Sequence, residues 1–286
     1  MRIVLVGNND GPLRLARALR NSPHRVVAIG MQKPAAPEVE EQMTTWPRLA
    51  VPDEPVLLRH LAELDFDLVV NCFANFRYRH TLRRYRCINV HLAPLPRYRG
   101  RHPLQWALIA GEETFGATVH EMSEAYDAGS ILLQTTVVIT PGSSAVRLRN
   151  VLLESVETRW ADFLTRLEAT TLSPRPNPDA LATYARRRTP DDAELDAEDW
   201  ADHRRLWRKV RALREDTFPA FLRLPGGKTE LRDATLLPDP VGKPAPRTVL
   251  STDRDSLCAS CTDGRAVRLY TFEPHAFRVG DLIPLP

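Results

Sequence analysis

The first half of the chain alternates short apolar segments with amphipathic ones, and this alternation limits the possible folds more than any other feature of the sequence. The pattern predicts strands at residues 2–7, 25–30, 67–73 and 86–92, and helices at 12–21 and 56–64. Short apolar strands separated by helices are typical of parallel sheets with helices on both faces. We therefore predict an α/β fold with a Rossmann-like, doubly wound, mostly parallel sheet.

A region of different composition follows. After a long helical pattern that begins at Ala145, residues 173–178 read Ser-Pro-Arg-Pro-Asn-Pro, which is typical of a linker. Beyond it, the pattern predicts a helix at 200–213 and strands at 229–236, 248–251, 256–261 and 266–272. We expect a catalytic domain at 1–172, a linker at 173–190 and a small β-rich C-terminal domain at 191–286.

The composition is that of an ordinary globular protein. With 286 residues and a net charge of +3, the chain has room for a sizeable core and no strong general attraction for nucleic acid. No apolar run is long enough to span a membrane, and the chain enters its first expected strand without a signal-peptide pattern. We expect a cytoplasmic protein with no membrane partner and without nucleic acid as its main partner.

The four cysteines do not indicate a disulfide framework. Cys72 and Cys87 lie in apolar, strand-like segments and are expected as small core residues. Cys258 and Cys261 have the spacing of a metal-binding pair, but a structural zinc site needs two further ligands, and His275 is the only histidine downstream. We therefore expect no metal, and the sequence leaves open whether this pair has a function.

Three polar residues form a candidate catalytic set. Asn89 and His91 lie two apart at the end of an expected strand, so their side chains should project from the same face. Asp127 lies on a turn that follows another expected strand, at 117–122. Each residue alone is more often structural. Together, an amide donor, an imidazole and a carboxylate that orients it are suited to acyl transfer.

This arrangement resembles the folate-dependent formyltransferase family. That family carries Asn-x-His, then a Leu-Pro…Arg-Gly loop, and then an Asp-x-Gly loop, which here are residues 89–91, 95–100 and 127–129. Residues 103–112 and 116–118 also look like family sequence. A combined pattern of this length is far more specific than any short motif. The resemblance implies a formyltransferase fold for the catalytic domain.

The resemblance also implies an activity, which is transfer of a formyl group from 10-formyltetrahydrofolate to an amine without a metal. Asn89 and protonated His91 would donate hydrogen bonds to the developing oxyanion, and Asp127 would stabilise the imidazolium and help to relay the amine proton. The family's folate contacts map onto Phe73, Ala74, Asn75, Arg101, Ser123, Glu124, Ala125, Tyr126 and Asp127. For Arg97 and Arg99, a solvated loop position explains the residues equally well.

The acceptor amine is left open. The chain resembles the formyltransferase domain that acts on UDP-4-amino-4-deoxy-arabinose, through residues 99–101, 118–120, 127–129 and 187–192. Methionyl-tRNA formyltransferases look similar too, but tend to carry an apolar residue where His120 stands, and a larger C-terminal domain. A small-molecule amine, an amino sugar carried on a nucleotide, is therefore the expected acceptor. Methionyl-tRNA, an amino acid or hydroxylamine of a natural-product pathway, and water, as in formyltetrahydrofolate hydrolases, are the alternatives.

Two features bear on partners. A basic run lies on and just beyond the expected helix at 200–213: Arg204, Arg205, Arg208, Lys209, Arg211 and Arg214. It could contact phosphates, but the acidic residues around it favour a solvated, charge-balanced face. The β-rich tail is a candidate surface for a homodimer.

Overall fold

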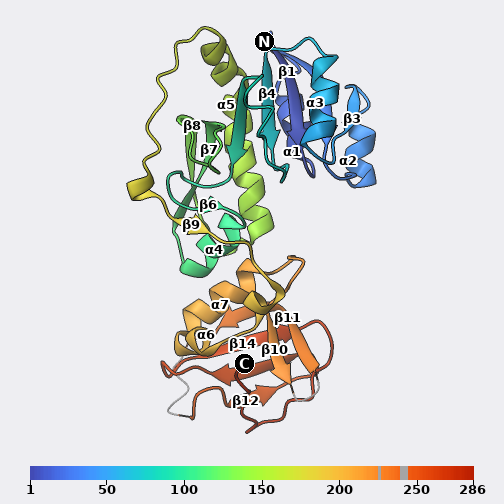
Figure 1. Ribbon diagram of the computed structural model, residues 1–286. Coiled ribbons are helices and arrows are strands. Elements are labelled where there is room, and N and C mark those ends of the chain that lie inside the picture. Colours follow the sequence, from blue (N-terminus) through green and yellow to red (C-terminus); the bar gives the residue numbers. More distant parts are fainter. Residues whose placement is uncertain (225–226, 239–243) are drawn as a thin grey trace. The chain divides into compact units, whose positions relative to one another are not determined.

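The computed structural model describes residues 1–224, 227–238 and 244–286 and contains two compact units (Figure 1). The first unit comprises Met1–Gly100, Phe115–Val137 and Asn150–Ala185. The second comprises Arg101–Thr114, Val138–Arg149 and Arg186–Pro286. Each unit is therefore assembled from segments that are far apart in the sequence.

The first unit is built on a seven-stranded sheet. In spatial order, its strands are β3 (Arg48–Ala50), β2 (Arg25–Met31), β1 (Arg2–Gly7), β4 (Leu68–Cys72), β5 (Cys87–His91), β7 (Thr114–Glu121) and β8 (Ile131–Val138). The pairs from β3 to β5 are parallel, and β7 runs antiparallel to β5. The predicted α/β class with a mostly parallel sheet is confirmed, and each of the four strands expected before residue 93 is found within one residue of its expected ends.

Helices cover both faces of this sheet. They are α1 (Gly11–Ala18), α2 (Pro37–Gln42), α3 (Glu54–Ala62) and α5 (Ala145–Glu168). Residues Ile3 to Val6 of β1 are all fully buried, although successive strand side chains point to opposite faces. The central strand is therefore enclosed on both sides, as a doubly wound sheet requires.

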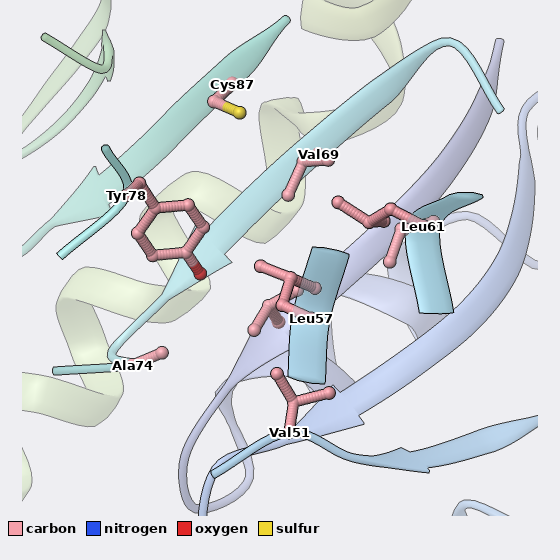
Figure 2. Close-up of a cluster of buried hydrophobic side chains, with 9 residues drawn as sticks. Val51, Leu57, Leu61, Val69, Ala74, Tyr78 and Cys87 are labelled. Carbon is pink, nitrogen blue, oxygen red and sulfur yellow. The ribbon is translucent and has the colours of Figure 1, made fainter. Parts of the chain in front are cut away.

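One side of the core surrounds α3 (Figure 2). Leu57 and Leu61 of this helix pack with Val69 of β4, and Tyr78 lies in the same cluster. Truncation of a buried leucine to alanine typically costs about 2–5 kcal/mol, so this cluster is a major source of stability. Burial raises the pKa of Tyr78, and its hydroxyl donates a hydrogen bond to Oδ1 of Asn71, across 3.1 Å. The apolar core thus ends at a polar residue near the end of β4.

The second unit contains the C-terminal β-rich region. Its helices are α4 (Pro103–Ala110), α6 (Ala197–Ala201) and α7 (His203–Ala212). Its antiparallel sheet has the spatial order β10 (Phe221–Leu224), β11 (Gly227–Leu236), β14 (Ala266–Thr271), β13 (Ser256–Ser260) and β12 (Val249–Thr252). The expected small β-rich C-terminal part is confirmed.

The prediction of a single helix at 200–213 is wrong. The structure has α6 and α7 with a break at Asp202, whose backbone is extended. The carboxylate of Asp202 accepts a hydrogen bond from the amide of Arg204, across 2.8 Å, and so caps α7. Asp202 therefore ends α6 and begins α7.

Residues 173–185, which lie within the segment expected as a linker at 173–190, are held within the first unit. A short strand, β9 (Tyr184–Ala185), pairs with β6 (Arg99–Gly100), and Arg175 forms backbone hydrogen bonds with Ile131 of β8. Among the helices of the described residues, none combines the length and the apolar character that a membrane span requires.

Candidate active site

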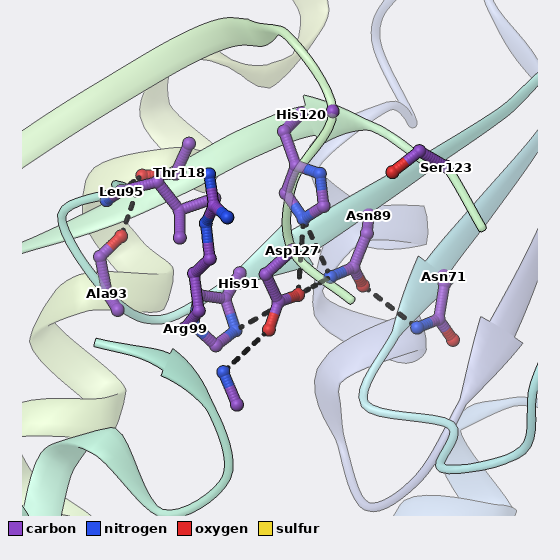
Figure 3. A network of polar contacts seen from close by, with 12 residues as sticks. Asn71, Asn89, His91, Ala93, Leu95, Arg99, Thr118, His120, Ser123 and Asp127 are labelled. Carbon is purple, nitrogen blue, oxygen red and sulfur yellow. Dashed lines mark hydrogen bonds and ion pairs between the residues drawn. The ribbon is translucent and has the colours of Figure 1, made fainter. Parts of the chain in front are cut away.

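Asn89 and His91 lie on β5 and occupy one region of the first unit (Figure 3). The Nε2 atom of His91 is 2.9 Å from the carbonyl oxygen of Tyr98, so this nitrogen carries a proton and donates it to the carbonyl. The second ring nitrogen, Nδ1, faces Asp127, with 3.8 Å between Nδ1 and Oδ1. In the neutral ring Nδ1 is therefore the nitrogen able to accept a proton.

The loop that supplies the Tyr98 carbonyl is fixed by Thr118 of β7. The hydroxyl of Thr118 donates to the carbonyl of Ala93 across 2.6 Å and accepts from the amide of Leu95 across 3.2 Å. The side-chain amide of Gln134 donates to the same hydroxyl and to the Leu95 carbonyl. These contacts set the position of the loop and hence the orientation of the His91 ring.

Asp127 is held by its own loop and by two distant segments. Its backbone has φ of 53°, the left-handed region that Asn and Asp tolerate best. Oδ2 accepts a hydrogen bond from the amide of Gly100 across 2.8 Å, and the carbonyl oxygen of Asp127 accepts from Nδ2 of Asn177 across 2.8 Å. The loop also requires Gly129, because an added Cβ there would lie 1.9 Å from the carbonyl oxygen of Glu121.

The environment of Asp127 keeps its carboxylate ionised. Burial alone would raise the pKa of this group. The opposing effects of His91, of the neighbouring His120 ring and of the Gly100 amide outweigh burial and hold the pKa of Asp127 well below its usual range. The structure therefore places a persistent negative charge beside His91.

Two residues of this cluster were not predicted from the sequence as site residues. His120 of β7 lies with Nε2 at 3.0 Å from Nδ2 of Asn89 and at 3.5 Å from Oδ1 of Asp127. Asn71 of β4 donates from Nδ2 to Oδ1 of Asn89 across 2.8 Å. Both are buried polar residues near strand ends. Their burial marks them as site residues, and it cannot be read from the sequence alone.

Arg99 departs from the expectation of a solvated loop. It is 1% exposed, and its guanidinium donates to the Asp179 carboxylate across 2.6 Å and to both oxygens of Asn177. Arg99 therefore anchors residues 177–179, and Asn177 in turn supports the Asp127 loop. The structure gives this arginine a supporting role outside the polar cluster.

The residues expected to contact folate lie in three places. Phe73, Ala74 and Asn75 follow β4, and Ser123 to Tyr126 form an exposed loop before Asp127. The segment that follows the first loop reaches the second, because Nε of Arg77 donates to the Tyr126 hydroxyl across 3.1 Å and its guanidinium lies 5.1 Å from the Tyr126 ring centroid. Arg101 is exposed and begins the second unit.

The cysteine pair near the C-terminus is buried in the second unit. Cys258 and Cys261 are both free, and burial raises the pKa of the Cys261 thiol to about 12, with a smaller effect of Asp263 and Asp202. Among the described residues, one group of side chains is close enough to share a metal ion: Asp202, His203 and Asp263. The Asp263 and Asp202 carboxylates accept hydrogen bonds from the backbone amides of His203 and Arg204 at the start of α7, which accounts for their position.

The site and the fold agree with the comparisons with known proteins. The profile of the formyl transferase family matches residues 2–160. A methionyl-tRNA formyltransferase of Halalkalibacterium halodurans is 30% identical over 96% of this chain and 90% of its own length. The chain belongs to the folate-dependent formyltransferase family, and it is an enzyme of formyl transfer, as the sequence resemblance implied.

Solved structures share the fold at lower identity. An N-formyltransferase from Helicobacter canadensis, solved with folinic acid and dTDP-3-aminofucose, has a TM-score of 0.73 and 14% identity, with 94% of this chain and 99% of that chain covered. HypX from Aquifex aeolicus in complex with tetrahydrofolic acid has a TM-score of 0.66 and 24% identity. This chain covers 43% of that protein, so it spans less than half of HypX.

Proposed function

We propose that this protein transfers a formyl group from 10-formyltetrahydrofolate to the primary amine of a nucleotide-linked amino sugar. The observation that carries the proposal is the convergence of Asn89, His91 and Asp127 within one buried polar cluster. It combines an oriented amide donor, an imidazole with one nitrogen able to accept a proton, and an ionised carboxylate.

Each side chain has a defined task in this reaction. When the neutral amine attacks the formyl carbon, negative charge gathers on the formyl oxygen, and the Nδ2 protons of Asn89 stabilise it. His91 is held by the Tyr98 carbonyl, so Nδ1 takes the proton that leaves the amine. The carboxylate of Asp127, with Oδ1 3.8 Å from Nδ1, stabilises the resulting imidazolium. The imidazolium then gives its proton to the nitrogen of the formyl donor, which leaves as its bond to the formyl carbon breaks.

The residues present fit a folate beside this cluster. Ser123 to Tyr126 are four consecutive exposed residues that lead directly into Asp127. Arg77, two residues beyond the Phe73–Asn75 loop, contacts Tyr126. The Phe73–Asn75 loop follows the carboxyl end of β4, and open α/β sheets bind their ligands at the carboxyl ends of their strands. When bound there, 10-formyltetrahydrofolate supplies the formyl group.

The basic run on α7 argues for a small acceptor. Lys209 is buried against Asp199, with 2.5 Å between Nζ and Oδ2, and Arg205 pairs with Glu198 across 2.9 Å. Arg214 pairs with Asp233 across 3.0 Å. A helix whose cations neutralise carboxylates of the same unit offers less charge for RNA phosphates. The expected charge-balanced face therefore supports a nucleotide sugar over tRNA.

Methionyl-tRNA is the second candidate acceptor. It is favoured by the 30% identity with the methionyl-tRNA formyltransferase of Halalkalibacterium halodurans. The similar solved structures include sugar N-formyltransferases as well as a methionyl-tRNA formyltransferase from Clostridium thermocellum.

The test is a screen of amine acceptors with 10-formyltetrahydrofolate, in which release of tetrahydrofolate is followed optically. We expect turnover with a nucleotide-linked amino sugar and a change in KM of only several-fold between about 50 and 200 mM salt, because two phosphates at most are contacted. Efficient formylation of methionyl-tRNA that weakens steeply over the same salt range, with no turnover of amino sugars, would exclude the proposed acceptor.

A further inference from the structure

Asn71, Asn89 and His120 form a row across three neighbouring strands (Figure 3). Asn71 of β4 pairs in register with Asn89 of β5, and Asn89 pairs in register with His120 of β7. Residues paired in this way place their side chains side by side. The row is therefore a direct consequence of strand register, and it brings a polar residue to each side of Asn89.

The first end of the row fixes the side-chain amide of Asn71. The backbone amide of Ala74 can only donate, and it donates to Oδ1 of Asn71 across 3.1 Å. Oδ1 of Asn71 also accepts from the hydroxyl of Tyr78. Nδ2 of Asn71 must then be the atom that faces Asn89, where it donates to Oδ1 across 2.8 Å.

The second end of the row fixes the tautomer of His120. The carbonyl oxygen of Glu121 can only accept, and it lies 2.7 Å from Nδ1 of His120. Nδ1 therefore carries the proton, and in the neutral ring Nε2 is an acceptor. Nδ2 of Asn89, at 3.0 Å, donates to it. All donors in the row point the same way, from the Ala74 amide to the Glu121 carbonyl.

This polarity determines which group Asn89 presents to the site. If the amide of Asn89 were reversed, its oxygen would face Nε2 of His120 and the Asp127 carboxylate, and its nitrogen would face Nδ2 of Asn71. The two amide nitrogens of Asn89 and Asn71, both donors, would then face each other, and the Asn89 oxygen would face the acceptors of His120 and Asp127. We propose that Asn71 is a positioning residue, which holds the Asn89 amide with Nδ2, and not Oδ1, on the side of His120 and Asp127, where one of its two protons can turn to the formyl oxygen when substrate binds. The role of Asn89 in this inference rests on the proposed formyl transfer.

Asn71→Asp tests the proposal with almost no change of shape. A carboxylate at 71 still accepts from Ala74 and Tyr78, but its second oxygen faces Oδ1 of Asn89 and favours the reversed amide. We expect kcat to fall about 10²-fold at neutral pH, as for loss of an oxyanion donor, with KM for the folate little changed. Asn150→Asp, an exposed substitution on α5, is the matched control and should retain wild-type kcat.

The pH profile separates positioning from simple structural damage. A protonated carboxyl group at 71 can again donate to Oδ1 of Asn89, so the ratio of variant to wild-type kcat should rise as pH falls. Protonation of the acceptor amine affects both proteins equally and cancels in this ratio. In an Asn89→Ala background, Asn71→Asp should cause no further loss, because Asn71 acts only through Asn89. A folded Asn71→Asp protein with kcat within about threefold of wild type at every pH would overturn the proposal.

Nuclear magnetic resonance tests the orientation of the Asn89 amide without an activity assay. In protein labelled with ¹⁵N-asparagine, the side-chain amide protons of Asn89 should show a nuclear Overhauser effect to the His120 ring, and this effect should be lost in Asn71→Ala. If the wild type shows no such effect, the inferred amide orientation is wrong. If the wild type formylates no amine while the effect is present, the proposed function fails and the amide orientation stands.

Discussion

The backbone amide of Gly100 donates a hydrogen bond to Oδ2 of Asp127 across 2.8 Å, although the two residues are 27 positions apart. Gly100 has φ of 102°, and an added Cβ would lie 2.5 Å from the carbonyl oxygen of Ala185 on β9. Only glycine meets both conditions without strain. The pairing of β6 with β9 therefore fixes the amide that holds the Asp127 carboxylate.

Gly100→Ala should damage the site and the fold together. A positive φ and a clash with the Ala185 carbonyl force the backbone to move, which we expect to lower stability by about 1–3 kcal/mol. The displaced amide should also lower kcat, by about tenfold, because a hydrogen bond to a charged group is lost. Urea unfolding and steady-state kinetics measure the two effects. Gly142→Ala is the control, since its Cβ would make only an ordinary contact with Arg147.

Asp127→Asn should change the pH dependence of stability. Because the pKa of Asp127 is held below that of the unfolded chain, about 3.9, its ionised form stabilises the fold at every pH above that value. That contribution is lost as pH falls through the lower, folded pKa. The difference in unfolding free energy between wild type and Asp127→Asn should thus shrink as pH falls below about 4. A difference that grows below about pH 4 would contradict the assigned pKa direction.

Arg77→Ala should weaken folate binding. Arg77 connects the two proposed folate loops through its contacts with Tyr126, so its loss should leave the Ser123–Tyr126 loop less ordered in the free protein. We expect the Kd for 5-formyltetrahydrofolate, measured by calorimetry, to rise several-fold because that loop must then be ordered on binding. Arg79→Ala removes an exposed arginine two residues away and should leave Kd unchanged. Equal effects of the two substitutions would rule out a specific role for the contact.

Lys209→Met should strongly destabilise the second unit. Nζ of Lys209 donates to Asp199 across 2.5 Å and to the carbonyl of Glu194 across 2.6 Å, and Asp199 is fully buried. Burial raises the pKa of Asp199 even beside this lysine, so its charge depends on the pair. Removal of one partner of a buried pair typically costs about 3–5 kcal/mol. The double variant Lys209→Met/Asp199→Leu should recover most of the loss in urea unfolding, whereas an additive second loss would contradict this explanation.

The sequence predicts the parts of this protein that depend on local pattern. Continuous apolar runs identify β1, β4 and β5, and the two-residue spacing of Asn89 and His91 places both near the end of β5. The turn chemistry around Asp127 identifies its loop, which the structure brings to the other two residues. Local periodicity and turn residues are sufficient at these positions because the structure there is determined by residues that are close in the sequence.

The remaining features depend on contacts between distant segments. Asn71 and His120 reach Asn89 only through the register of three strands, which a single sequence does not reveal. Arg99 lies in a segment whose sequence is typical of an exposed loop, yet it is buried against residues 177–179. Strand β8 was not predicted, because its apolar residues stand in runs at its two ends without a regular alternation and it is only partly buried along most of its length. Long-range pairing outweighs local preference in each case.

The most direct test of the account is kcat for His91→Ala with 10-formyltetrahydrofolate and the best acceptor amine. In the proposed reaction, Nδ1 of His91 takes the proton that leaves the amine, so kcat should fall about 10²-fold or more while urea unfolding shows an intact fold. His80→Ala, which removes an exposed histidine of the same unit, should keep wild-type kcat. A folded His91→Ala protein with near wild-type kcat would show that this cluster does not catalyse the transfer.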